Sequence, residues 1–144
     1  MAETVHPLSD LPLPTLGAPS PHLAGTEFEL RLLYYAAEPE DSLVTIHFIG
    51  TYAMRWGPPN DERRGELGLA KLNRPSEIRG STWLAGLIRA GQLESGGEED
   101  CGLSHFCLPF HDSTLDVAAD GYTFERRRAP IHEEFPDLAR KLVK

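Results

Sequence analysis

Cysteine is scarce in this sequence, with two residues in 144, and long apolar runs are missing. Two cysteines are too few for a disulfide-stabilised scaffold, and no run reaches the roughly 20 apolar residues that a membrane-spanning helix needs. The N-terminal stretch also lacks the basic start and the apolar block of a secretion signal. These absences predict a cytoplasmic protein with reduced thiols and no membrane partner.

Basic residues are in the minority, because 14 lysines and arginines face 22 aspartates and glutamates, for a formal net charge of −8. Nucleic-acid affinity depends mainly on lysine and arginine displacing counterions from phosphates, so the composition argues against a nucleic-acid partner. An acidic balance serves either solubility alone or the recognition of a basic protein.

Several motifs that mark enzymes are also missing. The sequence has no GxxxxGK[ST] phosphate-binding loop, no G-x-S-x-G elbow and no HExxH helix. We therefore expect no cofactor, and we favour a non-catalytic protein over an enzyme.

Proline and glycine, in contrast, are plentiful, with 12 and 13 residues. Five prolines fall within residues 1–24: Pro7, Pro12, Pro14, Pro19 and Pro21. Proline fixes φ and removes a backbone donor, so this segment is expected to form neither a helix nor an inner strand. The sequence predicts an extended arm over 1–24, either free or lying on the surface, and a single domain over 25–144.

Strand patterns dominate that domain. Strands are expected over residues 26–36, 42–56, 66–72, 103–110, 114–119 and 122–128, with a bend at Gly50 and a tight hairpin turn at Asp120-Gly121. A main helix is expected from a cap at Ser81, and a short one from about Asp137. The predicted fold is α+β: a mainly antiparallel sheet of about five strands, with the main helix packed on one face and a short C-terminal helix.

The stretch HFCLPFHDST (105–114) gathers the chemically versatile side chains. In a strand, alternation places His105, Cys107 and His111 on one face and the phenylalanines on the other. His105 and His111 would then lie about 20 Å apart, too far to share one zinc ion. A metal site is therefore an alternative that rests on His105 and Cys107, with a further ligand from elsewhere in the chain.

A catalytic alternative involves His111 and Asp112, because histidine can act as a general base near neutral pH beside a carboxylate. Neighbouring residues on a strand point to opposite faces, so adjacency in sequence does not bring the two side chains together. The competing interpretation is a turn whose Asp112, Ser113 and Thr114 bond to their own backbone. His47 would join such a site only if its strand neighbours the later ones.

Two loops, of which the first is acidic, are the predicted contact surface for a basic protein partner. The first spans residues 94–100 and contains Glu98, Glu99 and Asp100, and the second spans residues 58–64 and contains Asp61 and Glu62. A homo-oligomer that pairs through an exposed strand edge is a further alternative.

The run HFCLPFHDSTLDVAADGYTFE, about 20 residues, resembles a motif of small uncharacterised bacterial proteins in which an apolar strand leads into Phe-His-Asp. It is also similar to the FHDAE strand of some immunity proteins of bacterial toxin systems, although Ser113-Thr114 stands here in place of Ala-Glu. The resemblance implies a small acidic α+β protein of a bacterial cytoplasm that binds another protein and performs no chemistry.

Overall fold

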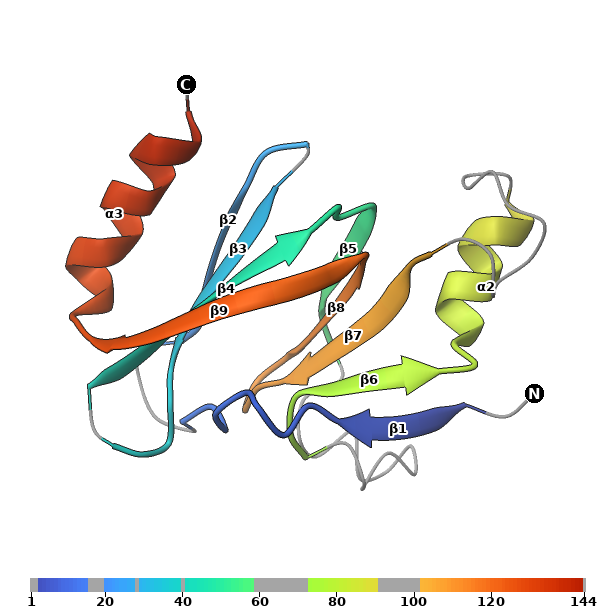
Figure 1. Cartoon of the computed structure of the whole chain (residues 1–144), viewed down its shortest axis with the longest axis horizontal. Helices are drawn as coiled ribbons and strands as arrows, with labels where there is room; N and C mark the ends of the chain where they lie inside the picture. The colour runs from blue at the N-terminus through green and yellow to red at the C-terminus, as the bar shows by residue number, and fades with distance from the viewer. Residues whose placement is uncertain are drawn as a thin grey trace.

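The computed structural model describes residues 3–15, 20–27, 29–39, 41–58, 73–90 and 102–143, which form two antiparallel sheets packed face to face (Figure 1). The strands are β1 (Thr4–Pro7), β2 (His22–Gly25), β3 (Leu30–Tyr35), β4 (Ser42–Ile49), β5 (Ala53–Gly57), β6 (Ser76–Arg79), β7 (Ser104–Pro109), β8 (Thr114–Ala119) and β9 (Gly121–Arg128). The helices are α2 (Thr82–Arg89) and α3 (Ile131–Leu142). One sheet has the order β1-β6-β7-β8-β5, and the other has the order β2-β3-β4-β9.

The predicted α+β fold is wrong. The described residues form nine strands in two sheets and two short helices, instead of about five strands in one sheet beneath a main helix. Period-two alternation shows that a segment is extended and has one apolar face, but it does not say which sheet the segment joins. In a sandwich and in a sheet covered by a helix, each strand needs the same alternation of apolar and polar residues, so the pattern does not distinguish the two folds.

Two of the incorrect strand predictions fall at one corner of the sandwich. The stretch 42–56 was expected to be one bent strand, and it is two strands in different sheets, with Gly50 at φ +62° between them. Beside it, β8 and β9 also lie in different sheets, so Asp120-Gly121 is not the predicted hairpin turn. The two crossings are joined where the Asp120 N–H donates to the Ile49 carbonyl at 2.8 Å. Strands that change sheets at a bend are the usual corners of sandwiches.

The proline-rich N-terminal segment contributes to both sheets over its described residues. β1 pairs with β6 at one edge of the larger sheet, and β2 pairs with β3 at one edge of the smaller sheet. Edge positions tolerate proline, because one side of an edge strand needs no ladder hydrogen bond. Between them, Leu11 is buried in the core, so the arm packs against the domain here.

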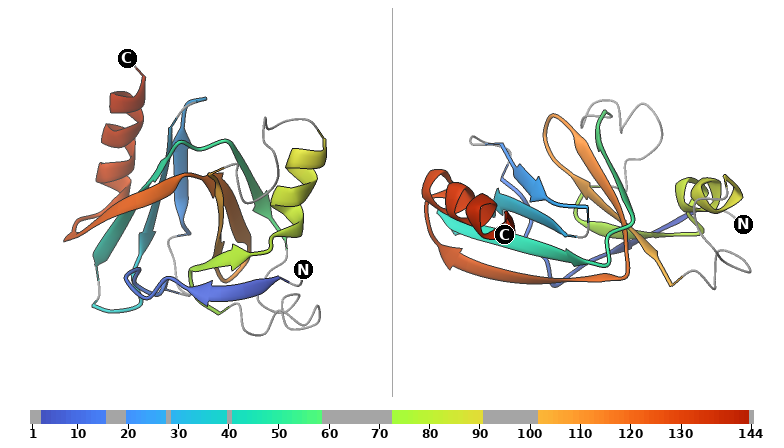
Figure 2. Two further views of the ribbon diagram at one scale, coloured as in Figure 1. Left: turned by 45° about the vertical axis from the view of Figure 1, so that its right-hand side comes forward. Right: turned by 90° about the horizontal axis from the view of Figure 1, so that it is seen from above.

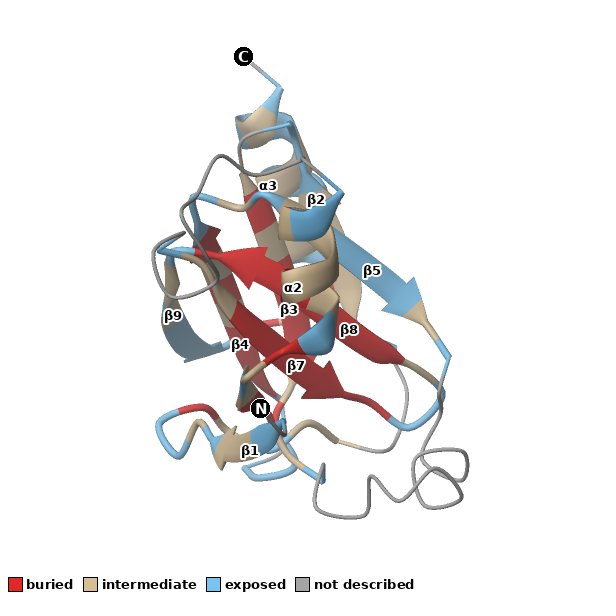
Figure 3. Cartoon of the chain, turned by 90° about the vertical axis from the view of Figure 1, so that its right-hand side faces the viewer, coloured by how far each residue is buried: buried red, intermediate tan, exposed pale blue. Residues whose placement is uncertain are grey.

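The core lies between the two sheets. The inner faces of β3, β4, β7 and β8 supply its most buried side chains, among them Leu32, Ile46, Leu108 and Val117. Figure 3 shows these four strands as the buried centre of the molecule, with β5 exposed at one side.

The helices lie on the outer sides of the sandwich (Figure 2). On the smaller sheet, Leu33 and Leu43 pack with Ile131 of α3, and the Tyr35 hydroxyl accepts a hydrogen bond from the Ile131 N–H at 2.8 Å. α3 begins six residues before the expected start near Asp137, because Pro136 lies inside it without ending it. The expected main helix, α2, has only eight described residues. Neither described helix has the length and apolar character that crossing a bilayer requires.

Candidate functional site

A polar cluster lies on the outer face of β7 and β8, beneath α2. Alternation turns Phe106 and Leu108 into the core, as the sequence predicts, and turns His105 and Cys107 of β7 and Asp116 of β8 to the opposite face. That opposite face is buried as well. Because buried polar groups are costly without partners, each of these side chains needs a hydrogen bond or an ion.

His105 connects two elements through its two ring nitrogens. Nδ1 lies 2.7 Å from the Ser81 hydroxyl oxygen, and Nε2 lies 2.6 Å from Asp116 Oδ1. Both contacts are satisfied when the Nε2–H donates to the carboxylate and Nδ1 pairs with the Ser81 hydroxyl. The ring is therefore held at both ends, which fixes its plane.

The position of Ser81 follows from the start of α2. Ser81 is the N-cap, as predicted, and its hydroxyl oxygen accepts a hydrogen bond from the Leu84 N–H at 3.0 Å. Trp83, two residues later in the first turn of α2, has its ring centre 4.9 Å from that of His105, edge to face. The Ser81 hydroxyl group thus caps α2 and also contacts His105.

Asp116 is held by one side chain from each of the two neighbouring strands, His105 of β7 and Arg55 of β5. Its cross-strand partners are Cys107 on β7 and Arg55 on β5, so the three side chains form a row across the sheet. The Arg55 Nε donates to Asp116 Oδ2 at 2.9 Å, and its guanidinium carbon lies 4.7 Å from the centre of the Trp83 ring. Burial alone would raise the pKa of Asp116, but the hydrogen bonds and charges of His105 and Arg55 together lower it below its ordinary value.

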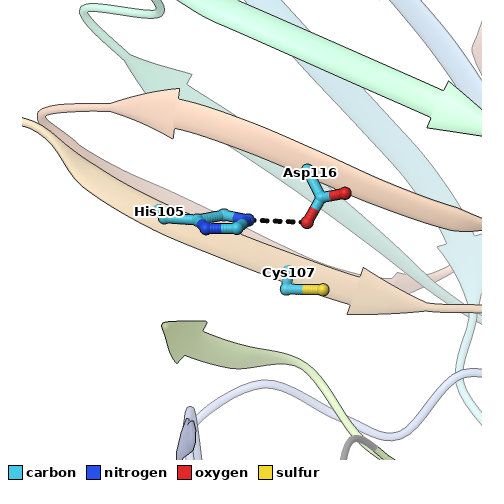
Figure 4. A group of neighbouring side chains, drawn as sticks. All are labelled: His105, Cys107 and Asp116. Atoms are coloured by element: carbon cyan, nitrogen blue, oxygen red, sulfur yellow. Dashed lines mark hydrogen bonds and ion pairs between the residues drawn. The ribbon is translucent and has the colours of Figure 1, made fainter. Parts of the chain in front are cut away.

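Figure 4 shows His105 and Cys107 on one strand with Asp116 facing them from the next. One ligand atom from each of the three lies within 4.8 Å of the other two, and all three residues are buried. In a tetrahedral zinc site, nitrogen, oxygen and sulfur ligands are about 3.3–3.5 Å apart, given bond lengths of about 2.0–2.3 Å. The spacing of the three ligand atoms brackets these values, with 2.6 Å between His105 Nε2 and Asp116 Oδ1 as the shortest contact given by a hydrogen bond.

The same cluster is a poor candidate for acyl transfer. Ser81, His105 and Asp116 form a chain of hydrogen bonds in the order that a nucleophile, a base and a carboxylate would have. However, Ser81 is only 2% exposed, and its oxygen is already engaged with the first turn of α2. The Ser81 oxygen is therefore not presented as an exposed nucleophile in this arrangement.

His111 and Asp112, the catalytic alternative, lie in the surface turn between β7 and β8, where the Phe110 N–H donates to the Ser113 carbonyl. His111 Nε2 is 3.9 Å from Asp112 Oδ1, and the Asp112 side chain is 88% exposed. The two residues line a pocket of about 250 Å³ together with Trp56. An exposed pair at this distance lacks the held geometry that general base catalysis needs.

His47 does not join either group. It lies on β4 in the other sheet, across from Arg31 and Thr123. Burial and then the charge of Arg31 lower its pKa. The acidic contact residues Glu98, Glu99, Asp100, Asp61 and Glu62 lie outside the described residues, and so does Cys101.

The sequence offered His105 and Cys107 only as alternative metal ligands and left the further ligand unnamed. In the structure Asp116 lies with them, His105 contacts the Ser81 hydroxyl, and Arg55 donates to Asp116. One signal for Asp116 is present in the sequence: it is the only charged residue in the apolar strand TLDVAA. A carboxylate in a strand that is buried on both faces is rare without a partner.

A second surface of interest lies on β5. Met54 and Trp56 pair with Val117 and Leu115, which belong to the core, yet they are 38% and 40% exposed. Among the described strands, β5 pairs only with β8 and is an edge of its sheet. On the core-facing side of β5, these two side chains are therefore only partly covered by the opposite sheet.

Comparison with known proteins finds no match for this chain among protein families, curated proteins or solved structures.

Proposed function

We propose that the protein binds a divalent transition metal, with zinc as the best fit, through His105, Cys107 and Asp116. The observation that supports this most directly is the gathering of an imidazole, a thiol and a carboxylate within 4.8 Å at a buried position. Imidazole and thiolate favour zinc over magnesium or calcium, which prefer oxygen ligands alone. Three protein ligands leave a fourth position for water or a bound molecule.

The surroundings of His105 suit a metal ligand. Nε2 faces Asp116, so it is the nitrogen that would bind the ion, while Nδ1 faces Ser81. On binding, the ring proton would move to Nδ1, and the Ser81 hydroxyl oxygen would become the acceptor. A ligating histidine whose other nitrogen donates to a fixed oxygen is the usual arrangement around protein-bound metals.

The charges set the conditions for binding. Zinc would require the thiolate of Cys107, so its affinity should fall as the pH falls. A reducing compartment, such as the proposed cytoplasmic location, would keep the Cys107 thiol available as a ligand. Oδ2 of Asp116 stays with Arg55, which leaves Oδ1 available for the ion.

Isothermal titration calorimetry with zinc, on protein cleared of metal by a chelator and kept reduced, tests the proposal. We expect one zinc ion per chain, together with buffer-dependent heat that reports proton release from Cys107. The conservative substitution Cys107→Ser should weaken binding at least about tenfold, because a hydroxyl is a much poorer zinc ligand than a thiolate.

Cys101→Ser and His111→Ala are the matched controls, since they remove the second cysteine and an exposed histidine of the same segment. Both should bind zinc as the unsubstituted protein does. If the unsubstituted protein binds no zinc, or if Cys101→Ser abolishes binding and Cys107→Ser does not, the proposal is wrong.

Protein recognition is the second candidate, and the exposed inner face of β5 favours it. Met54 and Trp56 are apolar side chains on an edge strand, which is a common place for an extended segment of a partner to add to a sheet. The net charge of −8 favours a basic partner, as would an immunity-like role in a bacterial cytoplasm. Under this candidate, acidic side chains of this chain, among them Glu98, Glu99 and Asp100, would favour the basic partner by charge.

A photo-crosslinking residue at position 54 tests this candidate in cells. We expect a crosslinked adduct of defined mass from position 54 and none from Val143, an exposed apolar residue at the far end of α3. The adduct should weaken when Glu98, Glu99 and Asp100 are changed to lysine. Equal crosslinking from both positions would contradict a specific surface on β5, and a self-adduct would indicate a homo-oligomer.

A further inference from the structure

We infer that Arg55 controls access of the metal to the proposed site, which rests on the proposed function. Ser81, Trp83 and the neighbouring strands bury His105 on its other sides, and its side chain is 4% exposed. Asp116 is 10% exposed at its side chain, whereas the Arg55 side chain that covers it is 56% exposed. Arg55 is therefore far more exposed than the His105–Asp116 pair that it covers.

Two contacts hold Arg55 over the site. Its Nε donates to Asp116 Oδ2 at 2.9 Å, and its guanidinium group lies on the Trp83 ring, with 4.7 Å between the guanidinium carbon and the ring centre. The Trp83 ring in turn contacts His105. Arg55, Trp83 and the His105–Asp116 pair thus form a closed ring of contacts.

This ring places a fixed positive charge where a cation must approach. Arg55 repels an incoming divalent ion and covers the Asp116 carboxylate that the ion has to reach. It is also the easiest member to move, because an exposed arginine on a surface strand loses little when it turns into solvent. The site should accordingly open when Arg55 releases Asp116, which makes the metal slow to bind and exchangeable.

Arg55→Gln removes the charge and keeps a hydrogen-bonding side chain of similar reach. Stopped-flow mixing with zinc, followed by Trp83 fluorescence in a Trp56→Phe background, measures the association rate. We expect Arg55→Gln to bind zinc about tenfold faster or more, and to lose most of the salt dependence of that rate. Arg79→Gln is the matched control, since Arg79 is 61% exposed on the same sheet and pairs with Glu77.

The outcomes separate this inference from the proposed function. If the parent protein binds zinc and Arg55→Gln binds it at the same rate or more slowly, Arg55 does not control access, and the metal site still stands. If no zinc binds to the parent or to Arg55→Gln, the proposed function itself is wrong. Equal acceleration in Arg79→Gln would show a general effect of net charge and would also overturn the role of Arg55.

Discussion

Asp116 has the most consequential environment of any single residue here. Among the described residues it is the only buried carboxylate, and it receives hydrogen bonds from both His105 and Arg55. Its pKa is lowered because these partners outweigh the effect of burial. Ionised Asp116 therefore stabilises the folded state above the ordinary aspartate pKa of about 3.9, and this contribution is lost as the pH falls through the lower pKa of the folded protein.

Asp116→Asn should be less stable than the unsubstituted protein by about 1–3 kcal/mol near pH 7, since an amide cannot balance Arg55 and offers a weaker acceptor to His105. The difference in unfolding free energy should shrink as the pH falls below about 4. Urea unfolding of metal-free protein at several pH values measures it. A difference that stays constant down to acid pH would show that the charge of Asp116 contributes nothing.

At the scale of residues, the sequence indicated two of the clustered side chains but not the residues that contact them. Alternation on one strand placed His105 and Cys107 on a common face, and the structure has them there. Their third companion comes from β8 and the anchoring hydroxyl from Ser81. Such contacts depend on strand register and on where a helix is seated, which no local pattern encodes.

At the scale of elements, α2 is short, and its N-terminal cap is important for its stability. The cap at Ser81 was predictable, because a serine ahead of an apolar-periodic segment is a common helix start. Its second role, bonding to His105, was not. Glu3 also contributes here, since its carboxylate accepts a hydrogen bond from the Thr82 N–H at 2.9 Å.

Ser81→Gly distinguishes the two roles. Glycine is a fair N-cap, and its substitution at a pure cap costs only a few tenths of a kcal/mol. Because the hydroxyl also satisfies a buried imidazole, we expect a loss of about 1–2 kcal/mol, close to that of Ser81→Ala. Chemical denaturation of the two variants provides the comparison. A much smaller loss for glycine than for alanine would reduce Ser81 to a helix cap.

Element boundaries follow from the sequence pattern in some places and not in others. The pattern predicts strands close to where β3, β4, β7, β8 and β9 lie, but it also predicts one strand over 42–56 and a hairpin turn at Asp120-Gly121, which the structure does not have. In both places the backbone passes from one sheet to the other. A glycine with positive φ is compatible with a bulge, a hairpin or a corner, and packing of the second sheet decides among them.

For the whole molecule, the core and the candidate site lie on different faces of the sheets. The inner faces bury the large apolar side chains, and the outer face of the larger sheet carries the polar cluster under α2. A site on strands buried on both faces is rigid, which favours the fixed geometry that metal ligation requires. The acidic net charge also attracts cations, although Arg55 opposes their final approach.

Absorption spectroscopy of the cobalt(II)-substituted protein is the most direct test of this account. A tetrahedral ion bound by Cys107 would give an intense thiolate-to-cobalt charge-transfer band that is lost in Cys107→Ser and kept in Cys101→Ser. That result is the one we predict. If cobalt at one equivalent gives no such band, or if the band survives in Cys107→Ser, His105, Cys107 and Asp116 form a hydrogen-bonded structural cluster and not a metal site.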